Sequence, residues 1–172
     1  MAANMGADTL KTNLSNPAKL WLWEAMFVNP IGGGNADVLD TRCRSAGLPG
    51  RSVGEIILPY KGTPGLIYPG KLQMSHSWRT VFVESTDKQT FDALYGWHQA
   101  IVNARTGVGG LDTTIKSDIY FKTLTQAGDT WLTIQLIGCY PADIAEVSMS
   151  YDDTGELVFP VTWAYDRWEE VS

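Results

Sequence analysis

Hydrophobic and polar residues alternate most strictly near the C-terminus of the chain. Every second residue of 157–165 is apolar, and successive side chains of a strand point to opposite faces. The apolar face consists of Leu157, Phe159, Val161, Trp163 and Tyr165. This pattern predicts a half-buried antiparallel strand. Pro160 removes one ladder donor from that strand, so we expect a sheet edge or a bulge there.

Further β-prone runs bounded by turn residues predict strands over 38–45, 72–84, 115–124, 130–137 and 146–151. Residues 19–28 form a strand that is apolar on both faces, so each face requires a cover. Two apolar patches within 54–70, joined by a Gly/Pro-rich turn, predict a hairpin arm. This arm is too apolar for a loop that is surrounded by water.

A single segment, 86–104, has a clear helical pattern. Its apolar residues recur at spacings of three and four, with Ser85 or Thr86 as the expected cap and His98 on the apolar face. The fold class is therefore mostly β: an antiparallel β-sandwich or barrel with one flanking α-helix and the hairpin arm. We expect one domain over 17–172, preceded by an N-terminal arm over 1–16.

Charge is unevenly distributed along this acidic chain. The net charge is −6 over 172 residues, the wrong sign for a protein that grips nucleic acid through phosphate contacts. Residues 42–79 hold six bases and one acid, whereas residues 112–172 hold eleven acids and three bases. Two regions of opposite charge suit a subunit that binds copies of itself head to tail.

Catalytic and metal-binding signatures are absent from the sequence. Its two histidines, His76 and His98, have no nucleophile at a catalytic spacing. Cys43 and Cys139 lie far apart without metal-type spacing, so we expect reduced, buried thiols. We therefore expect no enzyme activity and no cofactor. No window reaches the roughly 20 apolar residues of a membrane helix, and no secretory signal is recognisable.

Four segments, taken in their order along the chain, resemble the tail tube proteins of contractile-tailed bacteriophages. They are Arg42–Gly50, Ala93–Trp97, Gly138–Pro141 followed by Ile144, and Val161–Asp166. The resemblance extends over about 17–168. It implies a β-sandwich with a flanking helix, assembled as hexameric rings that stack head to tail into a hollow conduit for genome delivery. It also implies that the hairpin arm reaches the adjacent ring.

The implied partners are other copies of the chain and the tail sheath, baseplate and tail terminator proteins. DNA would pass through the lumen without specific binding, since carboxylates on the wall repel phosphates. The implied location is the virion tail, assembled in the host cytoplasm. The candidate residues for contact between rings are Arg42, Arg44, Arg51, Tyr60, Lys61 and Tyr68. The candidate lumen-facing residues are Asp118, Asp129, Asp152 and Asp153.

Two alternatives stay open. The inner tube of a type VI secretion or other contractile injection system shares this architecture. In a different class, a β-barrel ligand-binding module would use its Trp-rich faces to stack sugars or apolar ligands. The two classes differ in what the aromatic residues line, an interface or a pocket.

Overall fold

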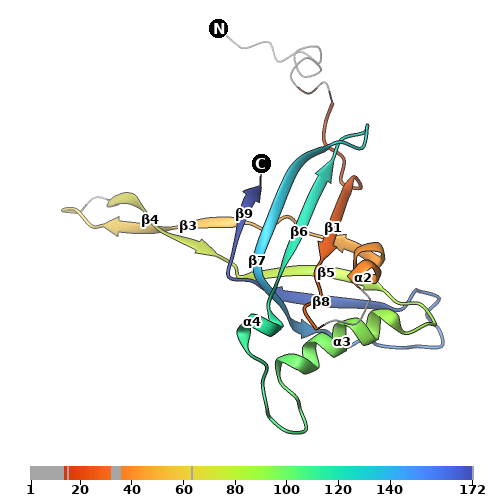
Figure 1. The fold of residues 1–172 in the computed structure, drawn as a ribbon. Coiled ribbons are helices and arrows are strands. Elements are labelled where there is room, and N and C mark those ends of the chain that lie inside the picture. Colours follow the sequence, from red (N-terminus) through yellow and green to blue (C-terminus); the bar gives the residue numbers. More distant parts are fainter. Residues whose placement is uncertain (1–13, 15, 32–35, 63, 172) are drawn as a thin grey trace.

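The computed structural model describes residues 14, 16–31, 36–62 and 64–171 (Figure 1). The expected N-terminal arm, 1–16, lies almost wholly outside this range. The described part is mostly β, as predicted, with a seven-stranded sheet and a separate two-stranded sheet. All pairings between neighbouring strands are antiparallel.

The seven-stranded sheet folds into two layers that share one long strand. The first layer consists of β1 (Trp23–Phe27), β6 (Ser117–Leu124), the first half of β7 (Thr130–Ile144) and β9 (Arg167–Val171). The second consists of the end of β7, β8 (Val158–Ala164), β5 (Ser77–Val83) and β2 (Cys43–Ala46). Figure 1 shows the strands of one layer running steeply across those of the other. Strand β9 was not predicted from the sequence.

Strand β7 changes layer at Gly138, the first residue of the Gly138–Pro141 segment that carries part of the family resemblance. The backbone there has a φ of +69°, which residues with a Cβ rarely adopt. Its N–H donates to Asp118 Oδ1 at 3.1 Å, and the N–H of Asp166 donates to the carbonyl of Ile137 at 2.9 Å. A Cβ at position 138 would collide with the Asp166 carboxylate. The corner therefore favours glycine, because a residue with a Cβ is strained at this φ and the Asp166 carboxylate would have to move aside.

An aromatic cluster fills the space between the layers. Trp163 lies 5.3 Å from Phe27 and 5.2 Å from Trp97, measured between ring centroids. The indole N–H of Trp163 donates to Thr80 Oγ1 at 2.8 Å, and that of Trp97 donates to the carbonyl of Ile115 at 2.7 Å. The predicted apolar face of 157–165 is confirmed: Phe159, Val161, Trp163 and Tyr165 are buried.

Helix α3 (Gln89–Ile101) is the predicted helix, shorter at both ends. Its buried face differs from the expected one and consists of Thr90, Ala93, Leu94 and Trp97. His98 is exposed, so its placement on the apolar face was wrong. The helix is oriented by Trp97, whose indole reaches across the core to Trp163.

Two short helices were not expected, α2 (Ala36–Arg42) and α4 (Asp112–Ile115). The strand predicted over 38–45 is therefore wrong except for its end, which forms β2. Leu39 of α2 is fully buried in the core. The Asp40 carboxylate accepts the N–H of Phe27 at 2.6 Å, so α2 packs against the end of β1. A buried contact of this kind leaves no periodic signal in a segment of seven residues.

The strand predicted over 146–151 is also wrong, since 145–157 form an irregular loop between β7 and β8. Pro160 explains where the ladder stops. The N–H of Ala145 donates to the carbonyl of Pro160 at 3.0 Å, but proline has no N–H to return the bond. Strand β8 is thus internal rather than an edge, and Pro160 lies at the end of its ladder with β7.

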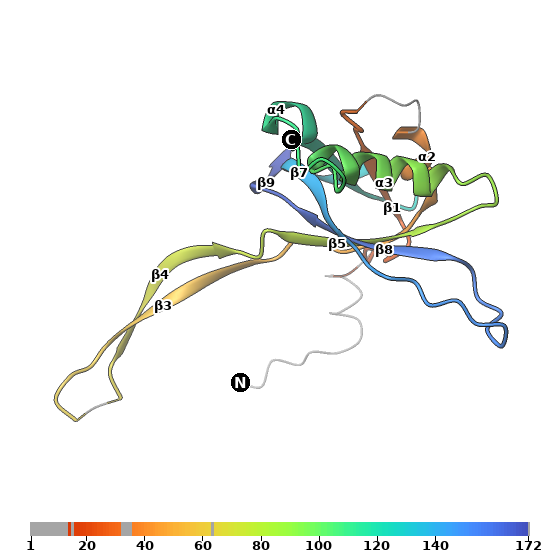
Figure 2. The same cartoon turned by 90° about the horizontal axis from the view of Figure 1, so that it is seen from below.

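The predicted hairpin arm is present and longer than 54–70. Strands β3 (Arg51–Leu58) and β4 (Leu66–Met74) pair only with each other, from Arg51 opposite Met74 to Leu58 opposite Leu66. In both ribbon views the arm projects away from the rest of the subunit (Figures 1 and 2). Within the described residues, the body of the subunit does not cover it.

Replacing Gly138 by alanine tests the corner of β7. We expect Gly138→Ala to lower the free energy of unfolding by about 1–3 kcal/mol, because alanine is strained at this positive φ and the Asp166 carboxylate must move aside. The matched control is Gly96→Ala in α3, where an added Cβ meets nothing within 4 Å. This change should raise stability by about 0.5–1 kcal/mol. Urea unfolding followed by fluorescence measures both, and an unchanged midpoint for Gly138→Ala would contradict the account.

Candidate assembly surfaces

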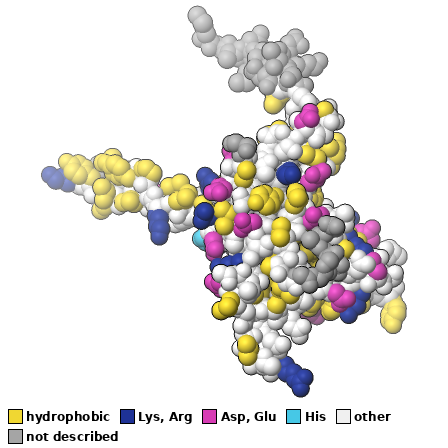
Figure 3. All heavy atoms as spheres, in the orientation of Figure 1, with side chains coloured by type: hydrophobic (Ala, Val, Ile, Leu, Met, Phe, Trp, Pro, Cys, Tyr) yellow, Lys and Arg dark blue, Asp and Glu magenta, His cyan; other side chains and the backbone are white. Residues whose placement is uncertain are grey.

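The arm exposes apolar side chains on both of its faces. Ile56, Leu58, Leu66 and Tyr68 share one face, because opposite residues of an antiparallel pair lie on the same side. Their exposed fractions are 51%, 51%, 56% and 47%. Ile57 and Ile67 on the other face are equally open. Figure 3 shows hydrophobic side chains along the arm and a basic side chain at its tip.

An isolated two-stranded hairpin is at best marginally stable in water. The arm also presents a large apolar patch, which in soluble proteins marks a site of interaction. Its fold and its composition therefore both point to a partner that covers it.

Three of the candidate contact residues form interactions within the subunit. The Arg42 guanidinium contacts Glu84 Oε1 at 3.2 Å and Asp87 Oδ2 at 2.5 Å. Arg44 pairs with Glu156 at 2.7 Å on the surface, and Arg51 stacks on the Trp168 ring at 3.9 Å. The hydrogen bond from Arg42 holds the pKa of Asp87 below its ordinary value. Contact of these arginines with another ring stays a prediction.

The other three candidates lie on the arm. Tyr60 and Lys61 are in its terminal turn, and Tyr68 is in β4. All three are exposed. The structure therefore brings Tyr60, Lys61 and Tyr68 onto one projecting element, with Arg51 at its base.

Glu84 is a residue that sequence reasoning missed. Its side chain is 6% exposed, and its carboxylate accepts the N–H groups of Thr90 at 3.3 Å and Phe91 at 2.6 Å. It thereby caps the start of α3 in place of the N-cap residue Lys88, which has a φ of 64° and whose own side chain forms no capping hydrogen bond. The cap is therefore not formed by the side chain of Ser85 or Thr86, the two residues expected from the sequence. The acidic residue directly after β5 was the available signal.

The four lumen candidates do not lie together. Asp118 is on β6, where its carboxylate also accepts the side-chain amide of Gln135 at 2.9 Å. Asp129 is exposed in the turn between β6 and β7, beyond the other end of β6. Asp152 and Asp153 are in the β7–β8 loop. Their facing a lumen stays a prediction.

The outer face of the first layer carries a mixed set of polar and charged side chains. The pairing register aligns Glu24, Lys122, Thr133 and Val171 in one row and Met26, Tyr120, Gln135 and Glu169 in the next. Of the lumen candidates, only Asp118 belongs to a strand of this layer. Strands β1 and β9 each pair on one side only within the described residues, so both are edges.

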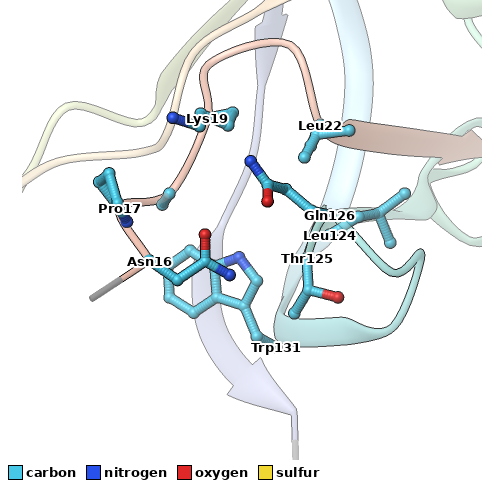
Figure 4. Close-up of a pocket in the computed structure, with 9 residues that line it drawn as sticks. Asn16, Pro17, Lys19, Leu22, Leu124, Thr125, Gln126 and Trp131 are labelled. Carbon is cyan, nitrogen blue, oxygen red and sulfur yellow. The ribbon is translucent and has the colours of Figure 1, made fainter. Parts of the chain in front are cut away.

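A shallow hollow of about 230 Å³ lies beside the first layer, near the start of the described chain (Figure 4). Trp131 forms one wall, facing Asn16 and Pro17, with Gln126 reaching in from the β6–β7 turn. Three of the seven tryptophans, Trp78, Trp97 and Trp163, are buried in the core, and Trp23 and Trp168 are partly buried against it. The aromatic residues thus chiefly fill the core, contrary to the pattern of a ligand-binding module.

In the part of the chain that the structure describes, no three potential metal ligands lie close enough together to hold a metal ion. Burial raises the pKa of the Cys43 and Cys139 thiols to about 12, and both cysteines are free. Cys139 is fully buried as predicted, whereas Cys43 is half-buried. Among the described helices, none combines the length and apolar character needed to cross a membrane.

Comparison with known families and structures gives a consistent result. A family model described as "Phage tail tube protein" matches residues 24–171. None of the curated protein sequences matches the chain.

Solved structures share the fold at low sequence identity. A chain of the anti-feeding prophage cap (AFP tube terminating cap) is similar with a TM-score of 0.64 and 16% identity, over 91% of both chains. A chain of the PVC sheath/tube terminator, from an extracellular contractile injection system, is similar with a TM-score of 0.65 and 14% sequence identity. The match covers 91% of this chain and 97% of that chain. A chain of the PVC sheath-tube complex is similar with a TM-score of 0.57 and 16% sequence identity. The match covers 97% of this chain and 99% of that chain.

Removing the Glu84 carboxylate tests its role at the start of α3. We expect Glu84→Ala to lower the free energy of unfolding by about 1–3 kcal/mol, because buried helix N–H groups lose their acceptor. Glu55→Ala, at an exposed position on the arm, is the control and should stay within about 0.5 kcal/mol of the parent. Thermal unfolding of the two variants side by side measures the difference. Equal effects would rule out the capping role.

Proposed function

The chain belongs to the phage tail tube protein family, and from this premise we propose that it assembles into hexameric rings, stacked head to tail, that enclose a conduit for DNA. It is a structural subunit of a tail tube. The observation that supports the ring and stack most strongly is the hairpin arm, whose exposed apolar faces require a neighbouring subunit.

The first layer supports a closed ring through its two free edges. Unpaired strand edges are liable to pair with other chains, and closure into a barrel abolishes them. Successive strands β1, β6, β7 and β9 alternate in direction, so β9 of one subunit would meet β1 of the next antiparallel. Rotation about one axis can repeat this contact until the wall closes. We propose that the first layers of six subunits form the wall.

The outer face of that layer would then line the lumen. It carries three acids, Glu24, Asp118 and Glu169, and two bases, Lys122 and Arg167. A wall of mixed and slightly negative charge has no continuous basic track for phosphates, so DNA would pass without specific binding. Asp118 is the lumen candidate on a strand of this face; Asp129 lies in the turn that joins β6 to β7, and Asp152 and Asp153 lie in the β7–β8 loop.

Stacking would use the arm. Its apolar faces and exposed Tyr60, Lys61 and Tyr68 would contact the adjacent ring, with Arg51 at its base. Arg42 forms ion pairs with Glu84 and Asp87 within its own subunit, so it stabilises the fold of that subunit. As a part of a tail or injection system, the tube would join sheath, baseplate and terminator proteins after assembly in the host cytoplasm, without enzymatic activity.

Negative-stain electron microscopy of the purified protein tests this proposal. We expect sixfold rings and hollow tubes, with tubes shortening at high salt because charged contacts between rings are screened. A variant in which a short Asn-Gly turn replaces residues 52–73 is the matched control and should give unstacked particles only. A uniform field of small single particles from the parent chain at every concentration would contradict the proposal and favour the ligand-binding module.

A further inference from the structure

We propose that the arm of one copy docks into a specific groove of a second copy, the groove between α3 and the β7–β8 loop. This inference rests on the proposed stacking function and deepens it by naming the receiving surface. We call this surface the α3 groove. Its lining residues are Glu84, Ser85, Lys88, Phe91, Tyr95, Glu146, Val147, Met149, Leu157 and Phe159.

The α3 groove is open and apolar at its base. It has a volume of about 460 Å³. Phe91 and Tyr95 stack at 4.1 Å between ring centroids, and Phe159 lies 6.1 Å from Phe91. Tyr95 is 37% and Met149 is 80% exposed, so part of this aromatic and aliphatic surface is uncovered. Its chemistry matches the arm face formed by Ile56, Leu58, Leu66 and Tyr68.

Charge complementarity favours this pair of surfaces. The arm, residues 51–74, contains three bases and one acid. The loop that borders the groove, residues 145–157, contains four acids and no base; Glu156 among them pairs with Arg44, which leaves Glu146, Asp152 and Asp153. The one basic side chain that lines the groove, Lys88, pairs with Asp92 at 3.0 Å. Glu146 and Asp152 are exposed, so they are placed to attract Lys61 at the tip of an incoming arm.

Other hollows in the described residues lack this match. The apolar hollow beside Leu48 and Trp131 has Lys19 as its only charged lining residue, which would repel a basic arm. The hollow beside Trp21 and Trp23 sets Arg44 against Glu24 and Asp40, and Asp40 already accepts the N–H of Phe27. The second hollow is also net negative, but its surface is more polar than that of the α3 groove, so it offers less apolar area to the arm.

The placement of the two surfaces excludes docking within one subunit. In both ribbon views the arm projects from one side of the body, and the β7–β8 loop with the start of α3 lies on the opposite side (Figures 1 and 2). A contact between two different surfaces on opposite sides is heterologous, so it can repeat from one subunit to the next in an open stack as well as in a closed ring. This is the geometry that stacking requires.

Reciprocal charge reversal is the first test. Lys61→Glu and Asp152→Lys should each raise the protein concentration at which tubes form by about five-fold, and the double variant should return it to within about two-fold of the parent. Asp129→Lys reverses an exposed acid outside the groove and is the matched control. Sedimentation of tubes measures all four variants. Additive weakening in the double variant would overturn the proposed pairing.

Disulfide trapping is the second test, and it does not depend on charge. A Leu66→Cys chain is mixed with a Met149→Cys chain of different mass under mild oxidation, and an adduct of both masses is expected in the tubes. The control mixture pairs Leu66→Cys with Leu48→Cys, an exposed residue at the hollow beside Trp131.

The outcomes separate the two proposals. Tubes without the Leu66–Met149 adduct, or with an equal Leu66–Leu48 adduct, would overturn docking in the α3 groove and leave the tube function standing. Failure of the parent chain to form any tube would overturn both.

Discussion

The bend of β7 at Gly138 is the constraint on which the two-layered fold depends. One strand supplies hydrogen bonds to β6 and β9 before the bend and to β8 after it. The positive φ and the close approach of the Asp166 side chain favour glycine at position 138. Because both layers are fixed to the same strand, their inner faces enclose one aromatic core around Trp163.

The body and the arm follow opposite physical rules. Body strands bury alternate side chains against Trp97, Trp163 and Phe27, and the indole donors of both tryptophans are satisfied inside. The arm exposes apolar side chains on both faces, and beyond its base, where Arg51 stacks on Trp168, its described strands pair only with each other. A lone subunit therefore has an unfavourable apolar surface that contact with another subunit would remove. In this account, the apolar surface of the arm is buried only when subunits assemble.

The sequence predicted those parts whose signal is periodic and local. The alternation over 157–165, the helix at 89–101 and the apolar hairpin arm were all recognisable from the residues. The strand expected over 38–45 failed because α2 depends on tertiary contacts of Leu39 and Asp40. The strand expected over 146–151 failed because Pro160 ends the ladder, an effect that acts across two strands rather than within one.

The candidate surface residues were harder to predict, for a related reason. A basic residue in a sequence carries no indication of its partner. Arg42, Arg44 and Arg51 lie close in the chain, yet they contact Glu84, Glu156 and Trp168, between 42 and 117 positions away. Lys61 and Tyr68 were better placed by sequence because a hairpin arm exposes its residues wherever the body lies. The local hairpin structure is therefore enough to predict which arm residues are exposed. The partner of a basic residue, by contrast, depends on the tertiary fold.

Hydrogen exchange of the arm amides tests the central claim most directly, that a neighbouring subunit completes the arm. The rates over 51–74 would be compared between dispersed subunits and tubes, with β6–β7 amides as the internal reference. Dispersed subunits should exchange the arm amides almost as fast as an unfolded chain, and tubes should slow them by about 100-fold or more. Arm amides that exchange equally in both states, while tubes are present, would contradict the account.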